Sequence, residues 1–253
     1  MRNSKTKMLV SKDTSVNPTW RRRPSPSRGP KPSVSASQIA GAAIRVADKE
    51  GLEAVTMQRI AGEMDLTTMA LYRYVSSKSD LVDLMIDSAS DSASVFGKPS
   101  QPWSDRLKEW ARRCFAIYRD HPWFLEATSM RRSIMGPNEL SWMEGALAML
   151  AESGLAPEKR HPAFLALIGH VRGHATFQQI RRYSESPEKW TIDLVQLLNS
   201  QAARYPILLD AVRSGAFSKA PTLAFDFGID CIIEGIRACI ADGKTRTPKR
   251  QRS

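Results

Sequence analysis

Two short apolar-patterned segments, separated by only three residues, constrain the fold most strongly. The stretch TMQRIAGEMDLTTMALYRYV (residues 56–75) predicts one helix over residues 57–64 and a second over residues 68–74. Thr56 and Thr67 are the expected N-caps, because a threonine hydroxyl accepts a hydrogen bond from a free amide at the start of a helix. The three-residue turn gives helix-turn-helix spacing, in which the second helix enters the DNA major groove amino end first. Spacing alone also fits an ordinary pair of packed helices.

The exposed face expected on the second helix carries groups that suit DNA. Hydroxyl, guanidinium and phenol groups can donate to phosphate or to a base edge, and a thioether can contact a thymine methyl group. The residues on this face are Thr67, Thr68, Met69, Arg73 and Tyr74.

The rest of the central region also has helical periodicity, and no segment between residues 36 and 243 reads as a strand. No internal repeat is visible. The expected fold is all-α, with about nine or ten helices. Beyond the stretch above, helices are expected from Ala36 to Gly51, from Lys78 or Ser79 to Ala89, along a stripe from Trp103 to Ile117, over 138–153, from Pro157 or Pro162 to Tyr183, from Trp190 to Ala203, and from Ala220 to Asp242.

Charge divides the chain into a nearly neutral body and two basic ends. The net charge is +11, of which residues 1–36 carry +8 and residues 244–253 carry +5. Basic tails beside a folded body favour a polyanionic partner, and charge blocks of this kind are usually disordered. We therefore expect a disordered basic tail over 1–35, a helical body over 36–243 that includes the helix-turn-helix, and a disordered basic tail over 244–253.

The cysteine count and the hydropathy pattern indicate a cytoplasmic protein. Three cysteines without a CxxC pair favour a reducing compartment. No apolar run is long enough for a transmembrane helix, and the basic N-terminus lacks the apolar segment of a secretory signal. We expect no membrane association.

The segment IRVADKEGLEAVTMQRIAGEMDLTTMALYRYVSSKSDLVDLMI closely resembles the N-terminal domain of the TetR family of transcriptional repressors. The resemblance covers roughly residues 36–90, and it implies a helix-turn-helix DNA-binding domain over 36–82 followed by a helical ligand-binding and dimerisation domain over 83–243. Less specifically, GPNELSWMEGALAMLAESGLAPE, ALIGHVRGHATFQ and FDFGIDCIIEGI resemble the ligand-binding and dimerisation domain of the same family.

This resemblance implies a homodimer that binds a palindromic double-stranded DNA operator and releases it when a small-molecule effector binds the C-terminal domain and moves the fourth helix. Carried onto this chain, Thr56 and Gln58 would contact phosphate and a base edge, and Thr68 and Met69 would read bases. Tyr72 and Tyr74 would hold the backbone, and Lys78 would bind phosphate. Many relatives have histidine at the position of Tyr74.

The arginine-rich N-terminal segment is unusual beside such a domain. It could lie in a minor groove, as the arms of homeodomains do. The alternatives are a solvated tail or a start codon placed too early. The candidate arm residues are Arg21, Arg22, Arg23, Arg28 and Lys31.

An effector pocket in this family should be apolar with few polar groups. Aromatic residues of the presumed ligand domain are more often core than pocket, and we expect a minority of them to line the pocket. The best candidates are Trp110, Trp142, His174 and Phe177, and the effector should be largely apolar. His170 and His174, at i and i+4, have a spacing that suits a metal ion, but no third ligand is evident. We favour histidines of the core or pocket and expect no metal and no cofactor.

Small residues and an apolar last helix indicate a dimer interface. Gly169 and Gly173 allow close helix approach, and the last helix is apolar over much of its circumference. Given the resemblance, we expect a dimeric four-helix interface that includes Gly169, Gly173, Phe225, Ile229, Ile232 and Ile236.

Other classes of function are less well supported. An enzyme is disfavoured, because the sequence has no Gly-rich phosphate loop, supported Ser/His/Asp set or clustered metal ligands. The open alternatives are an activator or partner-controlled regulator of the same fold, and a nonspecific nucleic-acid-binding protein that acts through its basic tails.

Overall fold

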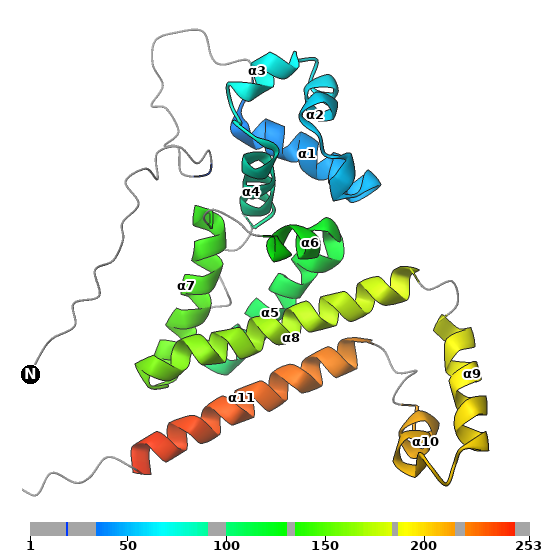
Figure 1. Ribbon diagram of the computed structural model, residues 1–253. Coiled ribbons are helices and arrows are strands. Elements are labelled where there is room, and N and C mark those ends of the chain that lie inside the picture. The colour runs from blue at the N-terminus through cyan, green and yellow to red at the C-terminus, as the bar shows by residue number, and fades with distance from the viewer. Residues whose placement is uncertain are drawn as a thin grey trace, which may run out of the picture. The chain divides into compact units, whose positions relative to one another are not determined.

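The computed structural model describes residue 19 and residues 34–90, 100–130, 135–183, 187–215 and 221–245. In this part of the chain it contains eleven α-helices, one short 3-10 helix and no strand (Figure 1). The elements are α1 (Ala36–Glu50), η2 (Leu52–Ala54), α2 (Met57–Glu63), α3 (Thr68–Tyr72), α4 (Lys78–Ala89), α5 (Trp103–Asp120), α6 (Trp123–Ser129), α7 (Pro137–Glu152), α8 (Pro157–Tyr183), α9 (Pro187–Ser200), α10 (Pro206–Arg213) and α11 (Pro221–Thr245).

The chain divides into two compact units. The described residues of the first lie within Met1–Ser92 and Glu126–Trp142, and those of the second within Ala93–Leu125 and Met143–Ser253. The domain boundary expected after residue 82 falls inside α4.

Helix α1 begins and ends where its sequence carries the signals for it. Ser35 accepts a hydrogen bond from the Gln38 amide, and the Gln38 side chain accepts one from the Ser35 amide, which makes a capping box. Gly51 ends the helix with φ at 86°, a left-handed value that favours glycine. The buried face, which includes Ile39 and Ala43, lies on the side that packs against α4 and α2. The first unit therefore has its own small core.

Helices α2 and α3 meet at a tight turn. Thr56 accepts a hydrogen bond from the amide of Arg59, and Thr67 accepts one from the amide of Ala70, each over 3.1 Å. Asp65 has a φ of 53°, a left-handed conformation that aspartate tolerates better than most residues. Each short helix thus begins at the threonine that the sequence predicts, and the pair forms the helix-turn-helix.

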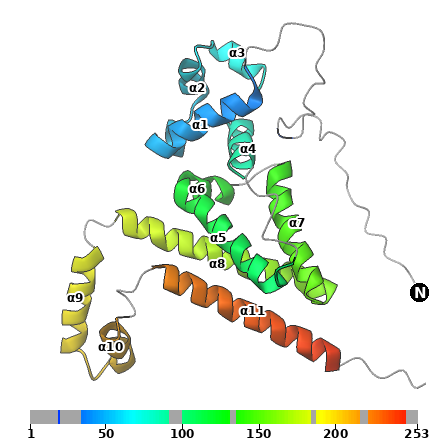
Figure 2. The ribbon, with the colours of Figure 1, turned by 180° about the vertical axis from the view of Figure 1, so that it is seen from behind.

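The second unit is built on three long helices. Helix α8 packs against both α5 and α11, and α11 also packs against α5. Figures 1 and 2 show α8 and α11 running side by side from opposite views. Buried side chains from each helix fill the space between them, among them Leu107, Leu167 and Ile229. Their packing is the core of this unit.

Helices α9 and α10 form a hairpin with a small core of its own. Leu198, Leu209 and Val212 are buried together, and Leu194 and Val195 pack against them. Pro206 stands in the first turn of α10, a position that proline favours.

The expected number of helices was too low. Helices α6 and α10 have seven and eight residues, which is too short to give a clear periodic pattern. The last helix continues to Thr245, two residues into the segment assigned to the basic C-terminal tail. No described helix is both long enough and apolar enough to cross a membrane.

Candidate DNA-binding site

The amino end of α3 presents two uncharged side chains to solvent. Met69 is 75% exposed, which is unusual for a large apolar side chain, and Thr68 is partly exposed. Leu71 is fully buried and anchors the opposite face of the helix. Because the Thr67 hydroxyl caps the first turn, α3 has a defined start with Thr68 and Met69 facing outward.

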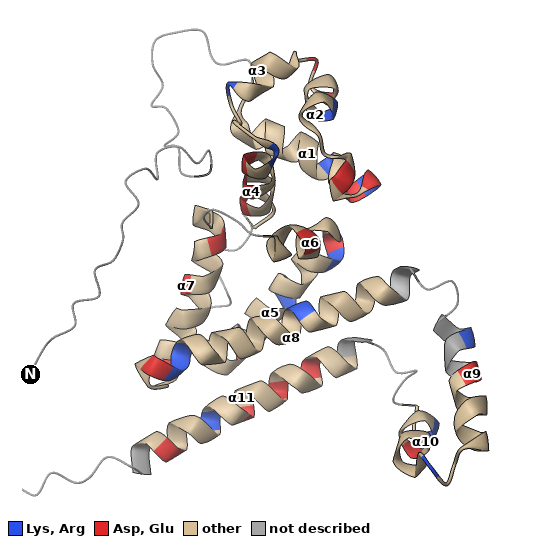
Figure 3. Ribbon diagram, viewed as in Figure 1, with Lys and Arg blue, Asp and Glu red and all other residues tan. Residues whose placement is uncertain are grey.

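The next residues continue this surface into α4. Tyr72 and Arg73 are exposed and Tyr74 is partly exposed. Lys78 is the first residue of α4 and is also exposed. Figure 3 marks basic positions in α2, at the end of α3 and at the start of α4. The amino end of a helix favours phosphate, because its first amides lack partners within the helix, and a lysine there adds a positive charge.

Helix α2 contributes Thr56 and Gln58, both of which are exposed. Arg59, on the same helix, forms ion pairs over 3.0 Å with Glu50 and Glu63. Its guanidinium is therefore engaged within the protein. All nine candidate DNA-binding residues lie in the first unit, at the start of α2, in or beside α3, or at the start of α4.

Ser77 was not singled out from the sequence. Its hydroxyl accepts a hydrogen bond from the Asp80 amide over 3.0 Å and so caps α4 one residue before the expected start. The pattern of serine followed three residues later by an acidic residue was the available signal. The candidate arm residues Arg21, Arg22, Arg23, Arg28 and Lys31 lie outside the described residues.

The structure does not place the four candidate effector-binding residues in one common environment. Trp110 is fully buried and its ring packs edge-on against Phe164. His174 is partly buried between the rings of Phe115 and Phe225. Phe177, in contrast, is 69% exposed. Trp142 belongs to the first unit, where its indole donates to the backbone oxygen of Ser90.

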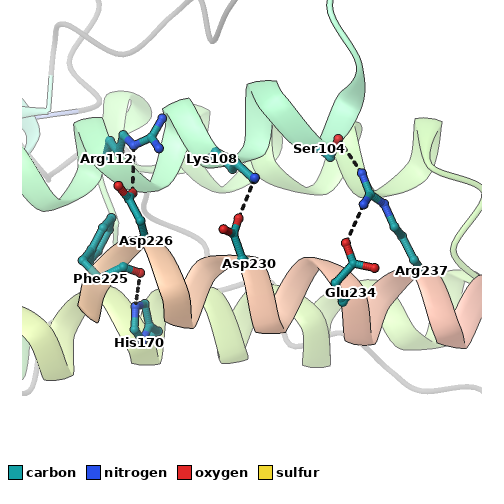
Figure 4. Close-up of polar contacts among 9 residues, drawn as sticks. All are labelled: Ser104, Lys108, Arg112, His170, Phe225, Asp226, Asp230, Glu234 and Arg237. Atoms are coloured by element: carbon teal, nitrogen blue, oxygen red, sulfur yellow. Dashed lines mark hydrogen bonds and ion pairs between the residues drawn. The ribbon is translucent and has the colours of Figure 1, made fainter. Parts of the chain in front are cut away.

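The histidine pair of α8 packs against α11. The rings of His170 and His174 have centroids 5.9 Å apart. The Nε2 atom of His170 lies 3.0 Å from the carbonyl oxygen of Phe225 (Figure 4). A Cβ atom on Gly228 would fall on the His170 ring, so glycine is required where this ring meets α11. The ring nitrogen of His170 is thus used for contact between two helices of this chain.

Most residues of the expected dimer stripe on α11 are packed within this chain. Phe225, Ile229 and Ile236 are buried within this chain, and Ile232 is partly buried. They lie in the packing of α11 against α5 and α8, so little of their surface remains for a partner. Gly169 and Gly173 are exposed on α8. The exposed large apolar side chains of the two helices are Leu165, Phe177 and Ile180 on α8, and Leu223 and Phe227 on α11.

Comparison with known proteins agrees with this architecture. Residues 39–85 match the family of bacterial regulatory proteins called tetR, and residues 96–240 match the tetracyclin repressor-like C-terminal domain. Together with the helix-turn-helix, these matches define a DNA-binding transcriptional regulator. The chain belongs to the TetR family.

Two proteins, one of them in two structures, illustrate the similarity. The chain is 34% identical over 227 residues to the HTH-type transcriptional repressor DrrR1 of Streptomyces coeruleorubidus, an alignment that covers 85% of this chain and 82% of that protein. The fold is similar to apo ActR from Streptomyces coelicolor, with a TM-score of 0.73, 24% identity, and coverage of 85% of this chain and 100% of that one. ActR in complex with actinorhodin gives a TM-score of 0.73 at 25% identity, covering 81% and 96%. DrrR1 is thus a transcriptional repressor, and ActR is a TetR family protein.

Proposed function

We propose that the protein is a dimeric repressor that binds a palindromic operator and is released from it by a small, largely apolar ligand. The observation that carries the DNA-binding part is the capped amino end of α3, with Thr68 and Met69 facing solvent above the buried Leu71. The similarity to the repressor DrrR1 supports the direction of regulation.

The roles of the DNA-binding residues follow from their chemistry and position. Thr68 and Met69 read base edges in the major groove, where a threonine hydroxyl can bond a base and a methionine can contact a thymine methyl group. Lys78 and the amino end of α4 hold a phosphate. Gln58 contacts a base edge. Contacts to the sugar-phosphate backbone of the DNA from Thr56, Tyr72 and Tyr74, and from Thr67 and Arg73, fix the register of the head on the duplex.

The ligand part of the proposal rests on the second unit. ActR, which is similar over most of its length, binds actinorhodin. In this chain α5, α8 and α11 carry many aromatic side chains, and polar groups lie among them. Arg172 donates to the Tyr118 hydroxyl over 3.2 Å, and Gln179 donates to the Pro122 carbonyl over 2.6 Å. Apolar walls with a few fixed polar groups suit a small aromatic ligand.

The dimer part of the proposal uses the exposed apolar surface of α8 and α11. Phe177 and Phe227 stand out from these two adjacent helices, and Gly169 and Gly173 leave the α8 backbone open to close approach. Single exposed apolar side chains are normal, but several large ones on neighbouring helices indicate a contact surface. Two copies that meet through α8 and α11 would form a four-helix interface.

A fluorescence anisotropy titration tests the DNA-binding proposal. The full-length protein is titrated against the duplex upstream of its own gene and against a scrambled duplex, over a salt series. We expect the native duplex to bind about 10³-fold more tightly or better. Equal affinities for the two duplexes that fall together with salt, also on genomic fragments, would contradict sequence-specific binding.

Variants of two surface residues separate the expected roles. Met69→Ala should weaken native-duplex binding by about 5- to 100-fold and narrow the preference over the scrambled duplex, since it removes a base contact. Lys78→Ala should weaken both duplexes and lower the salt slope by about two for a dimer, one for each phosphate contact. Lys49→Ala, an exposed lysine in the last turn of α1, is the matched control and should change neither quantity. The same assay then screens for a releasing ligand.

A further inference from the structure

A buried carboxylate fastens the end of α4 to the start of α7. Asp87, in the last turn of α4, is only 6% exposed. One of its carboxylate oxygens, Oδ1, accepts hydrogen bonds from the backbone amides of Asn138 over 2.8 Å and Glu139 over 3.3 Å. In return, the Asn138 side-chain amide donates to the backbone oxygen of Asp87 over 3.0 Å. All three residues belong to the first unit.

Asp87 does for α7 what an N-cap residue normally does. The first amides of a helix have no partner within it, and a side chain just before the helix usually accepts from them. Here the residue before Pro137 is Gly136, which has no side chain. The acceptor comes instead from a helix 51 positions earlier in the chain. A Cβ atom on Gly136 would fall on the Asp87 carboxyl group, so glycine is required for this arrangement.

A second contact joins the same two helices, and in it a side chain of α7 binds a backbone group at the end of α4. The indole Nε1 of Trp142 donates to the backbone oxygen of Ser90 over 2.9 Å. Ser90 is the C-cap residue of α4, and its hydroxyl donates to the carbonyl of Ile86 over 2.8 Å. Both side chains are buried. Helix α7 thus satisfies a carbonyl at the end of α4, while α4 satisfies amides at the start of α7.

These contacts tie α7 to the DNA-binding head. We call the set Asp87, Ser90, Gly136, Asn138 and Trp142 the α4–α7 joint. The other end of α4 carries Lys78, and α4 packs against α1 in the core of the head. Separating the two helix ends would break the hydrogen bonds between them. Loss of hydrogen bonds by buried polar groups costs free energy. The two helix ends therefore shift together more readily than they separate.

We propose that Asp87 is a positioning residue that couples α7 to the helix-turn-helix through the α4–α7 joint. This rests on the proposed function, in which DNA binding and ligand binding are linked. Linkage is reciprocal, so operator bound to the head must in turn stabilise the start of α7. That consequence can be measured before any ligand is known.

Hydrogen exchange of the full-length protein, measured by mass spectrometry with and without a saturating native duplex, tests the coupling. In the wild type, duplex should slow exchange of the amides in 138–142 by about fivefold or more. In Asp87→Ala, measured at duplex concentrations that still saturate the head, this slowing should be lost. Asp87→Asn should retain it, because an asparagine side-chain oxygen can also accept from α7. Asp105→Ala, an exposed carboxylate in the first turn of α5, is the control.

Gly136→Ala disrupts the α4–α7 joint from the residue that directly precedes α7. It displaces the carboxyl group sterically, so it should abolish the same slowing, and the double variant with Asp87→Ala should lose nothing further. Exchange in α1 checks that each variant keeps a folded head. Slowing over 138–142 that survives in both single variants would overturn the coupling while leaving DNA binding in place. Absence of duplex binding by the wild type would instead overturn the proposed function, and the coupling with it.

Discussion

Cys114 is the residue whose titration differs most clearly from its ordinary behaviour. Its side chain is buried on α5, and burial raises the pKa of the thiol from 9.0 to about 12, while nearby Arg172 acts in the opposite direction. In the folded protein the thiol therefore stays protonated well above the pH at which it ionises in the unfolded chain. A buried neutral cysteine of this kind acts as a small apolar side chain.

This shift predicts a pH dependence of stability. Above about pH 9 the unfolded chain loses the Cys114 proton and the folded chain keeps it, so the free energy of unfolding falls as pH rises towards 12. The contribution of the buried Cys114 thiol to the free energy of unfolding is fully present below about pH 9. Over this window the wild type should lose up to about 1.4 kcal/mol per pH unit more than Cys114→Ala. Urea unfolding of both proteins at several pH values gives the two slopes, and parallel slopes would contradict a buried neutral thiol.

Single residues also show how far sequence reasoning reaches. Thr56, Thr67 and Gly51 mark the helix ends where the sequence predicts them, because caps act over one turn and depend on local chemistry. The contact between Asp87 and Asn138 could not be predicted in the same way. It is a cap that comes from another helix, and nothing near either residue in the sequence indicates the other.

Helix α11 is attached to α5 by two kinds of contact. A row of polar pairs links the helices, with Arg112 to Asp226, Lys108 to Asp230, and Ser104 to Arg237 (Figure 4). Most of the charged partners in these pairs are substantially exposed, and such pairs contribute little to stability. The buried stripe that includes Phe225, Ile229, Ile233 and Ile236 removes large apolar surfaces from water.

The two kinds of contact should respond very differently to truncation. Ile233→Ala should lower the free energy of unfolding by about 2 to 5 kcal/mol, because it leaves a cavity in the core. Asp230→Ala should lower it by at most about 1 kcal/mol. Denaturant unfolding at one fixed protein concentration measures both. A larger loss for Asp230→Ala would show that the ion pairs hold this helix.

The same helix shows why an apolar stripe in the sequence does not identify the surface that meets a partner. An apolar stripe that faces helices of its own chain has the same spacing as one that faces a second copy. The spacing predicts Phe225, Ile229 and Ile236 at a dimer interface, whereas in the structure they are buried where α11 packs against α5 and α8 of the same chain. Sequence spacing identifies a buried face, whereas only the packing of the long helices shows which chain buries it.

At the scale of the whole molecule, the exposed apolar surface on α8 and α11 bears on assembly. Phe227 is 71% exposed and lies on the side of α11 that this chain leaves uncovered. Cys231 and Gly235, one and two turns further along, are exposed as well. In the proposed dimer this surface meets its counterpart in the second copy.

Phe227→Glu should therefore convert the dimer to a monomer, because two buried carboxylates without partners are costly. A monomer holds only one head, so affinity for a palindromic duplex should fall by about 10²-fold or more. Sedimentation velocity gives the mass and anisotropy gives the affinity. Met130→Glu, at another exposed apolar position, should alter neither. A Phe227→Glu protein with the mass of the wild type would place the interface elsewhere.

The packing of Gly136 against Asp87 couples sequence change at the two positions. A side chain at position 136 conflicts with the carboxyl group, whereas a smaller residue at position 87 conflicts with nothing that Gly136 has. A lineage that gains a side chain at 136 while Asp87 is present therefore loses the contact between this carboxylate and α7. The effect of a substitution at 136 thus depends on the residue at 87, and a residue that caps α7 locally from position 136 would take the place of the carboxylate from α4.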